Sequence, residues 1–330
     1  MRRPIPPSSA RSTEFLPAAR SLLVLRRQKP RSRRRPAALT LKDRIMIEIL
    51  QQIVNGVAIG GVYVLIALGL TTVFGILGIA HFAHGSVSMF GGYLTFFMVT
   101  AWGFPLLLAI LIALIVGFLL GMLIELLAYR PVRNANHINA FIVALGLTMM
   151  VEGLNLQFFG HEQVVIPTNL ARVFDIGGVT IPELRLYVII AAALLIIAMT
   201  LFVEKTKTGQ AIRAVAENRD AAILMGVNVK TIPLVVFAIS TALGVCAGVM
   251  VGSLFAIAPG IGEWLVVKGF AVLILGGLGS IPGAIVGGLV LGVTEALAAG
   301  FISSAYKDVI AFVVMIAVLL LRPQGLMGKA

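Results

Sequence analysis

The apolar residues of this chain come in stretches of about twenty, long enough to cross a membrane as helices. No Asp, Glu, Lys or Arg lies between Glu48 and Glu125. At about 1.5 Å per helical residue, this block is roughly three times as long as the hydrocarbon core of a bilayer is thick. The pattern therefore predicts several consecutive membrane-spanning helices.

Nine apolar segments are candidates for such spans. They lie near residues 49–70, 72–101 with an interruption, 104–128, 138–159, 184–203, 232–258, 264–280, 282–300 and 306–321. The segments lack the strict alternation of membrane-barrel strands, and outside a closed barrel only a helix satisfies its own backbone in lipid. We predict an all-α, polytopic membrane helix bundle of about eight or nine spans, with broken or re-entrant helices.

Basic loops predict how the spans are oriented. The loop near 129–137 holds Arg130 and Arg133, and the segment 204–230 holds five Lys and Arg residues. The positive-inside rule places both loops and the C-terminus in the cytoplasm. Three apolar segments before Arg130 then leave the N-terminus outside, unless the one around GILGIAHFAHG is broken or re-entrant.

The composition supports a membrane protein, because 59% of the residues are hydrophobic and 12% are charged, against about a quarter charged in soluble domains. The formal charge is +12. However, thirteen Lys and Arg and two acidic residues lie before Met46, and they account for +11 of it. The remaining chain is nearly neutral, so the charge does not indicate nucleic-acid binding.

Residues 1–45 form a basic arm rich in Pro, Arg and Ser, which we expect to be disordered in isolation. The arm can be a polybasic anchor at the membrane surface, a transit-like presequence, or translated sequence upstream of a true start at Met46. We favour the last, because MIEILQQIVNGV begins a span at once. Residues 46–330 are then the transmembrane domain.

Glycines cluster inside the apolar segments, as in GVAIGG and GVCAGVMVG. Small residues let helix backbones approach closely, so these clusters predict packing faces. GILGIAHFAHGS and GGLGSIPGAIVGG each interrupt an apolar run that resumes with a Gly-Gly pair. This hints at an internal duplication with discontinuous helices, as in many transporters.

No residue pattern indicates catalysis: the chain has no nucleophile with a base and no phosphate-binding glycine loop with Lys, so we do not expect an enzyme. Cys246 is the single cysteine, which excludes a disulfide within one chain. His81 and His84 are too few ligands for a zinc site. We expect them to form a polar hinge, with no metal.

Five ionisable residues fall within or beside the apolar segments. They are Glu125, Glu152, Glu263, Lys268 and Glu295. We expect most to be interfacial, Glu125 because it precedes a cytoplasmic loop, and Glu263 and Lys268 because they flank the start of a span. Only Glu152 and Glu295 lie deep enough to suggest a buried partner. The five form no evident series of proton-relay groups, which argues against a proton-coupled carrier.

The segment EKTKTGQAIRAVAENRDAAILMGVNVKTIP is long and polar, with helix-forming residues. Its small residues Ala221 and Ala222, followed by Gly226 as a helix stop, suit a docking surface for a cytosolic partner. A solvated charged loop is the alternative. Within it, DAAILMGVN resembles the EAA-type loop by which permeases of ABC importers contact their ATPase subunits, with Asp220 where that pattern has Glu.

Three further stretches point to one family. They are NGVAIGGVYVLIALGLTTVFGILGIAHFAHGSVSMFGGY, AYRPVRNANHINAFIVALGLTMM, and GGLGSIPGAIVGGLVLGVTEAL followed by YKDVI. Together they resemble the LivH-type permeases of branched-chain amino acid ABC importers, from about Met46 to the C-terminus. The basic arm has no counterpart in that pattern.

The resemblance implies a subunit of the bacterial inner membrane that pairs with a second, homologous permease, two cytosolic ATPase subunits and a periplasmic substrate-binding protein. ATP would be bound by the partners, so no cofactor is expected here. The implied ATPase-docking residues are Glu217, Asp220, Ala221, Ala222 and Gly226. Polarity and position suggest pathway or hinge roles for Asn55, Tyr63, Thr71, Thr72, His84 and Ser86.

The substrate is less defined than the family. Leucine, isoleucine and valine are favoured, but urea, short amides or other amino acids use similar permeases. A stand-alone secondary carrier and a structural membrane subunit remain as alternatives from other classes. A carrier would transport without partners, whereas a structural subunit would support no uptake.

Overall fold

The computed structural model describes residues 41–132, 137–258 and 260–328. The residues from Arg44 onward form one structural unit, and the description concerns this unit. Nearly all of the predicted basic arm, residues 1–45, lies outside the described residues.

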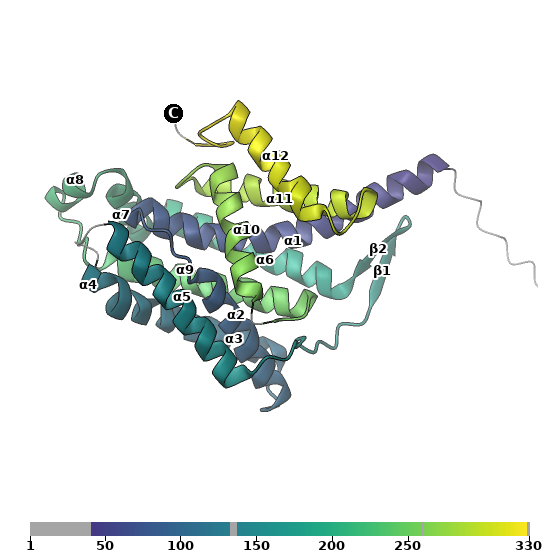
Figure 1. The fold of residues 1–330 in the computed structure, drawn as a ribbon, viewed down its shortest axis with the longest axis horizontal. Coiled ribbons are helices and arrows are strands. Elements are labelled where there is room, and N and C mark those ends of the chain that lie inside the picture. The colour runs from purple at the N-terminus through teal and green to yellow at the C-terminus, as the bar shows by residue number, and fades with distance from the viewer. Residues whose placement is uncertain (1–40, 133–136, 259, 329–330) are drawn as a thin grey trace, which may run out of the picture. The chain divides into compact units, whose positions relative to one another are not determined.

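Helices make up most of the unit (Figure 1). Their bounds are α1 Leu41–Leu77, α2 His84–Thr100, α3 Leu106–Ile124, the π-helical η2 Glu125–Tyr129, α4 Arg130–Val132, α5 His137–Phe159, α6 Glu183–Lys205, α7 Lys207–Glu217, α8 Arg219–Leu224, α9 Ile232–Leu254, α10 Ile261–Gly276, α11 Ile281–Phe301 and α12 Lys307–Leu321. The predicted all-α class is thus confirmed.

A short β-hairpin lies between α5 and α6. Strands β1 (Val173–Ile176) and β2 (Val179–Pro182) pair antiparallel. Gly177 and Gly178 connect them with φ of 65° and 93°, the two positive values that a type I′ turn requires. The hairpin lies in the loop that the sequence predicts on the outer side.

Six helices are long and apolar enough to cross a membrane, within the part of the chain that the structure describes. They are α1, α3 with its continuation to Val132, α5, α6, α9 and α11. The short helices α2, α10 and α12 have 17, 16 and 15 residues, so each is about 22–26 Å long and falls short of the roughly 30 Å hydrocarbon core. The predicted count of eight or nine spans is therefore not confirmed, although each predicted segment corresponds to a helix.

The boundary predicted near residues 70–72 is wrong, because α1 continues to Leu77 without a break. Nothing in Thr71 or Thr72 stops it: the Thr72 hydroxyl donates to the Leu68 carbonyl oxygen at 3.0 Å, a bond that a helix tolerates. The interruption comes later, at Gly78, whose φ is 62°.

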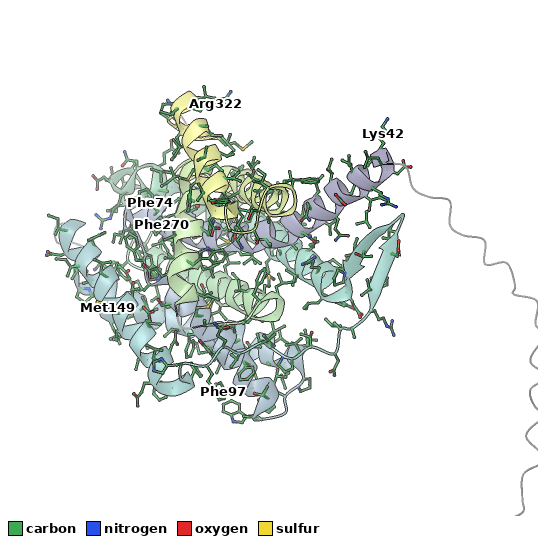
Figure 2. The ribbon with its side chains drawn as sticks, turned by 45° about the vertical axis from the view of Figure 1, so that its right-hand side comes forward. Lys42, Phe74, Phe97, Met149, Phe270 and Arg322 are labelled. Carbon is green, nitrogen blue, oxygen red and sulfur yellow. The ribbon has the colours of Figure 1, made fainter. Side chains whose placement is uncertain are left out.

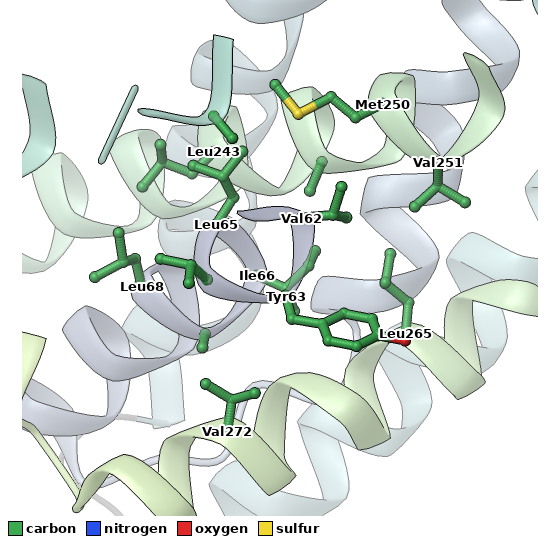
Figure 3. Packing of buried hydrophobic residues seen from close by; sticks show 14 of the residues in the cluster. Val62, Tyr63, Leu65, Ile66, Leu68, Leu243, Met250, Val251, Leu265 and Val272 are labelled. Atoms are coloured by element: carbon green, nitrogen blue, oxygen red, sulfur yellow. The ribbon is translucent and has the colours of Figure 1, made fainter. Parts of the chain in front are cut away.

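Helix α1 is the central element of the unit. Every residue from Val62 to Val73 is buried, so this stretch is covered on all sides, as a helix apolar on every face should be. Figure 3 shows Val62 and Leu65 near Leu243 and Met250 of α9, whereas Tyr63 is directed toward Leu265 of α10. Side chains at the periphery are apolar too, such as Met149 on α5 (Figure 2), which is 76% exposed.

Glycines allow a close contact between α1 and α11. A Cβ atom on Gly292 of α11 would lie 2.5 Å from the Cα of Gly60 on α1, and one on Gly56 would lie 2.5 Å from the Cα of Val293. Real Cβ atoms do not approach backbone that closely, so only glycine permits this crossing. The predicted packing role of GVAIGG is confirmed.

The short helices α2 and α10 begin at one point inside the bundle. A Cβ on Gly85 would lie 1.9 Å from the carbonyl oxygen of Gly262. From this point α2 follows α9, with Gly92 against Gly248, whereas α10 follows α1, with Gly269 against Ile66 and Leu70. The predicted interruption around GILGIAHFAHG is therefore present, and it places the start of α2 within the bundle.

Candidate functional site

The segment predicted to dock a partner folds as two short helices. Thr206 caps α7 by accepting a hydrogen bond from the Gly209 amide at 2.9 Å, and the Asn218 side chain caps α8 through the Ala221 amide at 3.0 Å. Both are typical N-cap interactions. Gly226 follows α8 with φ of 82°, and its amide donates to the Ile223 carbonyl oxygen at 3.0 Å. The predicted helix stop at Gly226 is confirmed.

Burial divides the predicted docking residues into two groups. Glu217, Asp220, Ala221 and Gly226 are exposed, whereas Ala222 is 3% exposed and belongs to an apolar cluster with Ile212, Val215 and Ile232. The Ala222 side chain packs α8 against the bundle, and its part in docking stays a prediction.

The most exposed apolar side chains of this segment were not among the predicted docking residues. Leu224 is 88% exposed and Met225 is 84% exposed, at the end of α8. We refer to Ile223, Leu224 and Met225 as the α8 tip. The apolar run AILMG within a charged segment was the feature of the sequence that could have predicted this tip. Exposed neighbouring apolar side chains on a polar segment indicate a contact surface.

The six predicted pathway or hinge residues do not form one site. On α1, Asn55 and Thr72 are about 25 Å apart along the helix axis. Asn55 accepts a hydrogen bond from Arg185 of α6, and Ser86 accepts one through its carbonyl oxygen from Asn155 at 3.0 Å. Thr71, Thr72 and His84 are buried. None of the six lines the cavity described below.

The two histidines lie where α2 begins, as the hinge interpretation expects. His81 and His84 are 1% and 0% exposed. The His81 Nδ1 atom lies 2.8 Å from the Tyr129 hydroxyl oxygen, and the His84 ring packs against Gly69 and Gly244. Among the described residues, no group of three or more His, Cys, Asp and Glu side chains is arranged to hold a metal.

A charged cluster that was not predicted from the sequence lies between α1, α10, α11 and α12. Lys268 is 1% exposed, and its Nζ atom forms ion pairs with Glu295 and, at 2.8 Å, with Asp308. The Tyr63 hydroxyl donates to the second carboxylate oxygen of Glu295 at 2.7 Å. We refer to Tyr63, Lys268, Glu295 and Asp308 as the Lys268 cluster.

The cluster revises the expectations for the ionisable residues. The buried partner predicted for Glu295 is confirmed. Lys268 and Glu125, which were expected at the membrane interface, are both 1% exposed, so their side chains are buried in the bundle, and their depth in the membrane stays a prediction. Glu263 is exposed at the first turn of α10. Glu152 is only partly buried on α5, and no described residue forms an ion pair with it.

A cavity of about 320 Å³ opens beside the Lys268 cluster. Helix α10 contributes Gly260 at its N-cap, the side chains of Glu263, Trp264 and Val267, and Lys268, whereas α12 contributes Asp308 and Phe312. The lining thus combines one buried cation, two carboxylates and an apolar wall. Small-molecule sites commonly have this mixture of an apolar wall and a few polar groups.

Comparison with known proteins gives one consistent result. A family model described as "Branched-chain amino acid transport system / permease component" matches residues 52–319. The chain is 38% identical over 294 residues to the high-affinity branched-chain amino acid transport system permease protein BraD of Pseudomonas aeruginosa, an alignment covering 85% of this chain and 96% of BraD.

Two other relatives carry similar names. The chain is 36% identical to the permease protein LivH of Escherichia coli, over 85% of this chain and 96% of LivH. It is 31% identical to a probable branched-chain amino acid transport permease protein LivH of Methanocaldococcus jannaschii, over 80% and 88% of the two chains. No solved structure gives a significant match.

Proposed function

This chain belongs to the family of branched-chain amino acid transport permeases, and we propose that it is the permease subunit of an ATP-driven importer that moves leucine, isoleucine and valine across the inner membrane. The observation that carries the proposal is the extent of the similarity. The matched residues 52–319 include most of α1, nearly all of α12 and every helix between them. The relatives named for branched-chain amino acid transport are covered over 96% of their length.

The α8 tip supports a partner on the cytoplasmic side. Leu224 and Met225 are among the most exposed apolar side chains of the unit, and they follow the basic segment that the positive-inside rule places in the cytoplasm. We propose that the tip inserts into an ATPase subunit, with the exposed Glu217, Asp220 and Ala221 around it. Two ATPase subunits would then serve this chain and a second, homologous permease. ATP binding belongs to those subunits, and this chain needs no cofactor of its own.

The interruptions in α1–α2 and α9–α10 support a two-state conduit. Helices α2 and α10 begin at a common point and run in different directions from it, held by backbone contact between Gly85 and Gly262. Such a contact permits one helix to shift against the other without removing side-chain volume. Displacement of α7 and α8 by the ATPase would reach the core through α9, which contacts α2 and α3 extensively. A periplasmic binding protein would deliver the substrate on the opposite side.

The test is uptake by the reconstituted assembly. We would co-express this chain with the second permease and the two ATPase subunits, place the assembly in proteoliposomes, add the binding protein, and measure ATP-dependent uptake of labelled leucine. The decisive variant is Met225→Asp, which places a charge on the α8 tip. Because a carboxylate in an apolar contact costs several kcal/mol unless it is paired, we expect uptake to fall at least tenfold with loss of ATPase co-purification.

Ile176→Asp is the matched control, since Ile176 is also strongly exposed, at 67%, but lies in the hairpin on the predicted outer side. This variant should retain leucine uptake, and the ATPase subunits should still co-purify with it. Uptake by this chain alone without ATP would overturn the importer and favour a secondary carrier. Uptake of urea or short amides in place of leucine would retain the importer and correct its substrate.

A further inference from the structure

The Lys268 ammonium group forms a fixed floor of the cavity beside α10. Lys268 is held by Glu295 on one side and by Asp308 on the other, and Glu295 is held in turn by the Tyr63 hydroxyl. The Phe312 ring centroid lies 4.7 Å from the Nζ atom. An ammonium group has three N–H donors, and the two carboxylates take two of them. One donor remains for a ligand at a position that the cluster fixes.

The mouth of the cavity is acidic. Asp308 is 40% exposed, and the exposed Glu263 carboxylate forms no hydrogen bond or ion pair with any residue that the structure describes. With Lys268, these lining groups sum to a formal charge of −1. An exposed carboxylate without a protein partner can accept charge-assisted hydrogen bonds from a ligand. This face therefore suits a ligand with a cationic group.

The remaining lining is apolar and defines a space for a small side chain. Trp264, Val267 and Phe312 form the wall, and the volume of about 320 Å³ is at the lower end of the range for small-molecule sites. At the end nearest Gly260, α10 begins without a side-chain cap. The Ile261 amide donates to the Ala258 carbonyl oxygen at 3.1 Å, so the amides of the next two residues, Gly262 and Glu263, are the additional donors for a negatively charged group.

We propose that this cavity is a binding site for a zwitterionic amino acid with an aliphatic side chain. The assignment rests on the proposed function and adds a place on the transport route where the substrate is bound by the permease itself. The α-ammonium group lies against Glu263 and Asp308. The α-carboxylate accepts from the remaining Lys268 donor and the start of α10, and the side chain packs against Trp264, Val267 and Phe312.

Trp264 allows a direct test, because the chain has only two tryptophans, Trp102 and Trp264. The full chain with Trp102→Phe would be placed in lipid nanodiscs, and the emission of Trp264 recorded during titration with leucine. We expect a saturable change. 3-Methylbutylamine lacks the carboxylate and 4-methylpentanoate lacks the ammonium, so each should bind at least tenfold more weakly, as expected for the loss of one charge-assisted contact.

Two variants with matched controls identify the site. Glu263→Gln should weaken leucine binding at least tenfold while leaving the Lys268 pairs intact, whereas Glu152→Gln, on α5, should not change it. Val267→Phe fills the cavity and should abolish the signal, whereas Val313→Phe, which adds the same volume at a residue of α12 that is 58% exposed, should not. Equilibrium binding of labelled leucine to the same nanodiscs would check the fluorescence.

The outcomes are separable from those of the proposed function. If the complete assembly imports leucine but neither measurement detects binding, or if Glu263→Gln binds leucine like the parent chain, the site is overturned and the importer stands. Equal binding of 3-methylbutylamine and leucine would also overturn it, because the cavity would then recognise a cation only. Failure of the assembly to import leucine would overturn the function on which the site rests.

Discussion

At the scale of single residues, the position of a buried charge depends on the side chains that pair with it. Lys268 and Glu295 are 27 residues apart in sequence, and Asp308 lies 40 residues beyond Lys268. A hydropathy pattern treats a lysine as the edge of a span, so it placed Lys268 at an interface. Only packing of α10 against α11 and α12 shows that the ammonium group is covered and neutralised. The same pattern placed Glu295 correctly, because that residue stands alone in the middle of an apolar segment.

Removal of the buried lysine should expose the cost of an unpaired charge. Lys268→Met keeps most of the side-chain volume but leaves Glu295 without its cation. Breaking a buried pair in this way costs about 3–5 kcal/mol. We expect a clear fall in the apparent Tm of the detergent-solubilised protein, measured by thermal shift and by the loss of the monodisperse peak on size exclusion.

A second substitution separates charge from packing. Lys268→Met combined with Glu295→Gln should recover part of the lost stability, because the neutral amide needs no cation. Lys230→Met is the control, since Lys230 is exposed and its substitution should be within about 0.5 kcal/mol of the parent. Equal stability of the single and double variants would show that Lys268 acts through packing alone.

At the scale of elements, the sequence predicted where helices lie better than how long they are. Each of the nine apolar segments corresponds to a helix, because apolar stretches without charge have no other stable form in lipid. The division of α1 near residue 70 was wrong. A broken helix around GILGIAHFAHG was predicted only as the alternative to an N-terminus on the outer side of the membrane. Helix ends inside the bundle depend on which backbones touch, as between Gly85 and Gly262, and that information is spread over distant parts of the chain.

The crossing of α1 and α11 should be sensitive to a single methyl group. In Gly292→Ala, the new Cβ would lie 2.5 Å from the Gly60 backbone, and neither helix has a flexible side chain there that can move aside. We expect a loss of about 1–3 kcal/mol, the usual cost of overpacking, seen as a lower apparent Tm and reduced membrane accumulation.

Gly153→Ala provides the comparison within another helix. A Cβ on Gly153 of α5 meets nothing within 4 Å, and alanine favours the helix over glycine by about 1 kcal/mol. This variant should be as stable as the parent or slightly more stable. If both substitutions behaved alike, the close approach of α1 and α11 would not be a feature of the protein in the membrane.

At the scale of the whole molecule, the contacts show that the start of α1 and the α8 tip lie at opposite ends of α6. The Gln51 side-chain amide donates to the Thr180 carbonyl oxygen of the hairpin at 2.9 Å, so this part of α1 lies beside β2. Helix α6 leads away from the hairpin and reaches α7 at its other end. The part of α1 around Gln51 and the α8 tip are therefore separated by the length of α6, about 35 Å for 23 residues. The start of α1 thus lies beside the hairpin, on the predicted outer side, whereas the loop that holds Arg130 is predicted in the cytoplasm. An odd number of membrane crossings between the two agrees with this arrangement.

Chemical labelling of intact cells would determine the sidedness. Cys246 is the single cysteine and is 4% exposed, so the parent chain should not react with a membrane-impermeant maleimide. Ile176→Cys places a thiol on the hairpin, and Leu224→Cys places one on the α8 tip. We expect the first to react in cells whose outer membrane alone is permeabilised, and the second only after the inner membrane is opened. The reverse result would invert the molecule in the membrane and remove the α8 tip from reach of an ATPase. Reaction of both thiols before the inner membrane is opened would mean that α6 does not cross the bilayer, in conflict with its length and apolar composition.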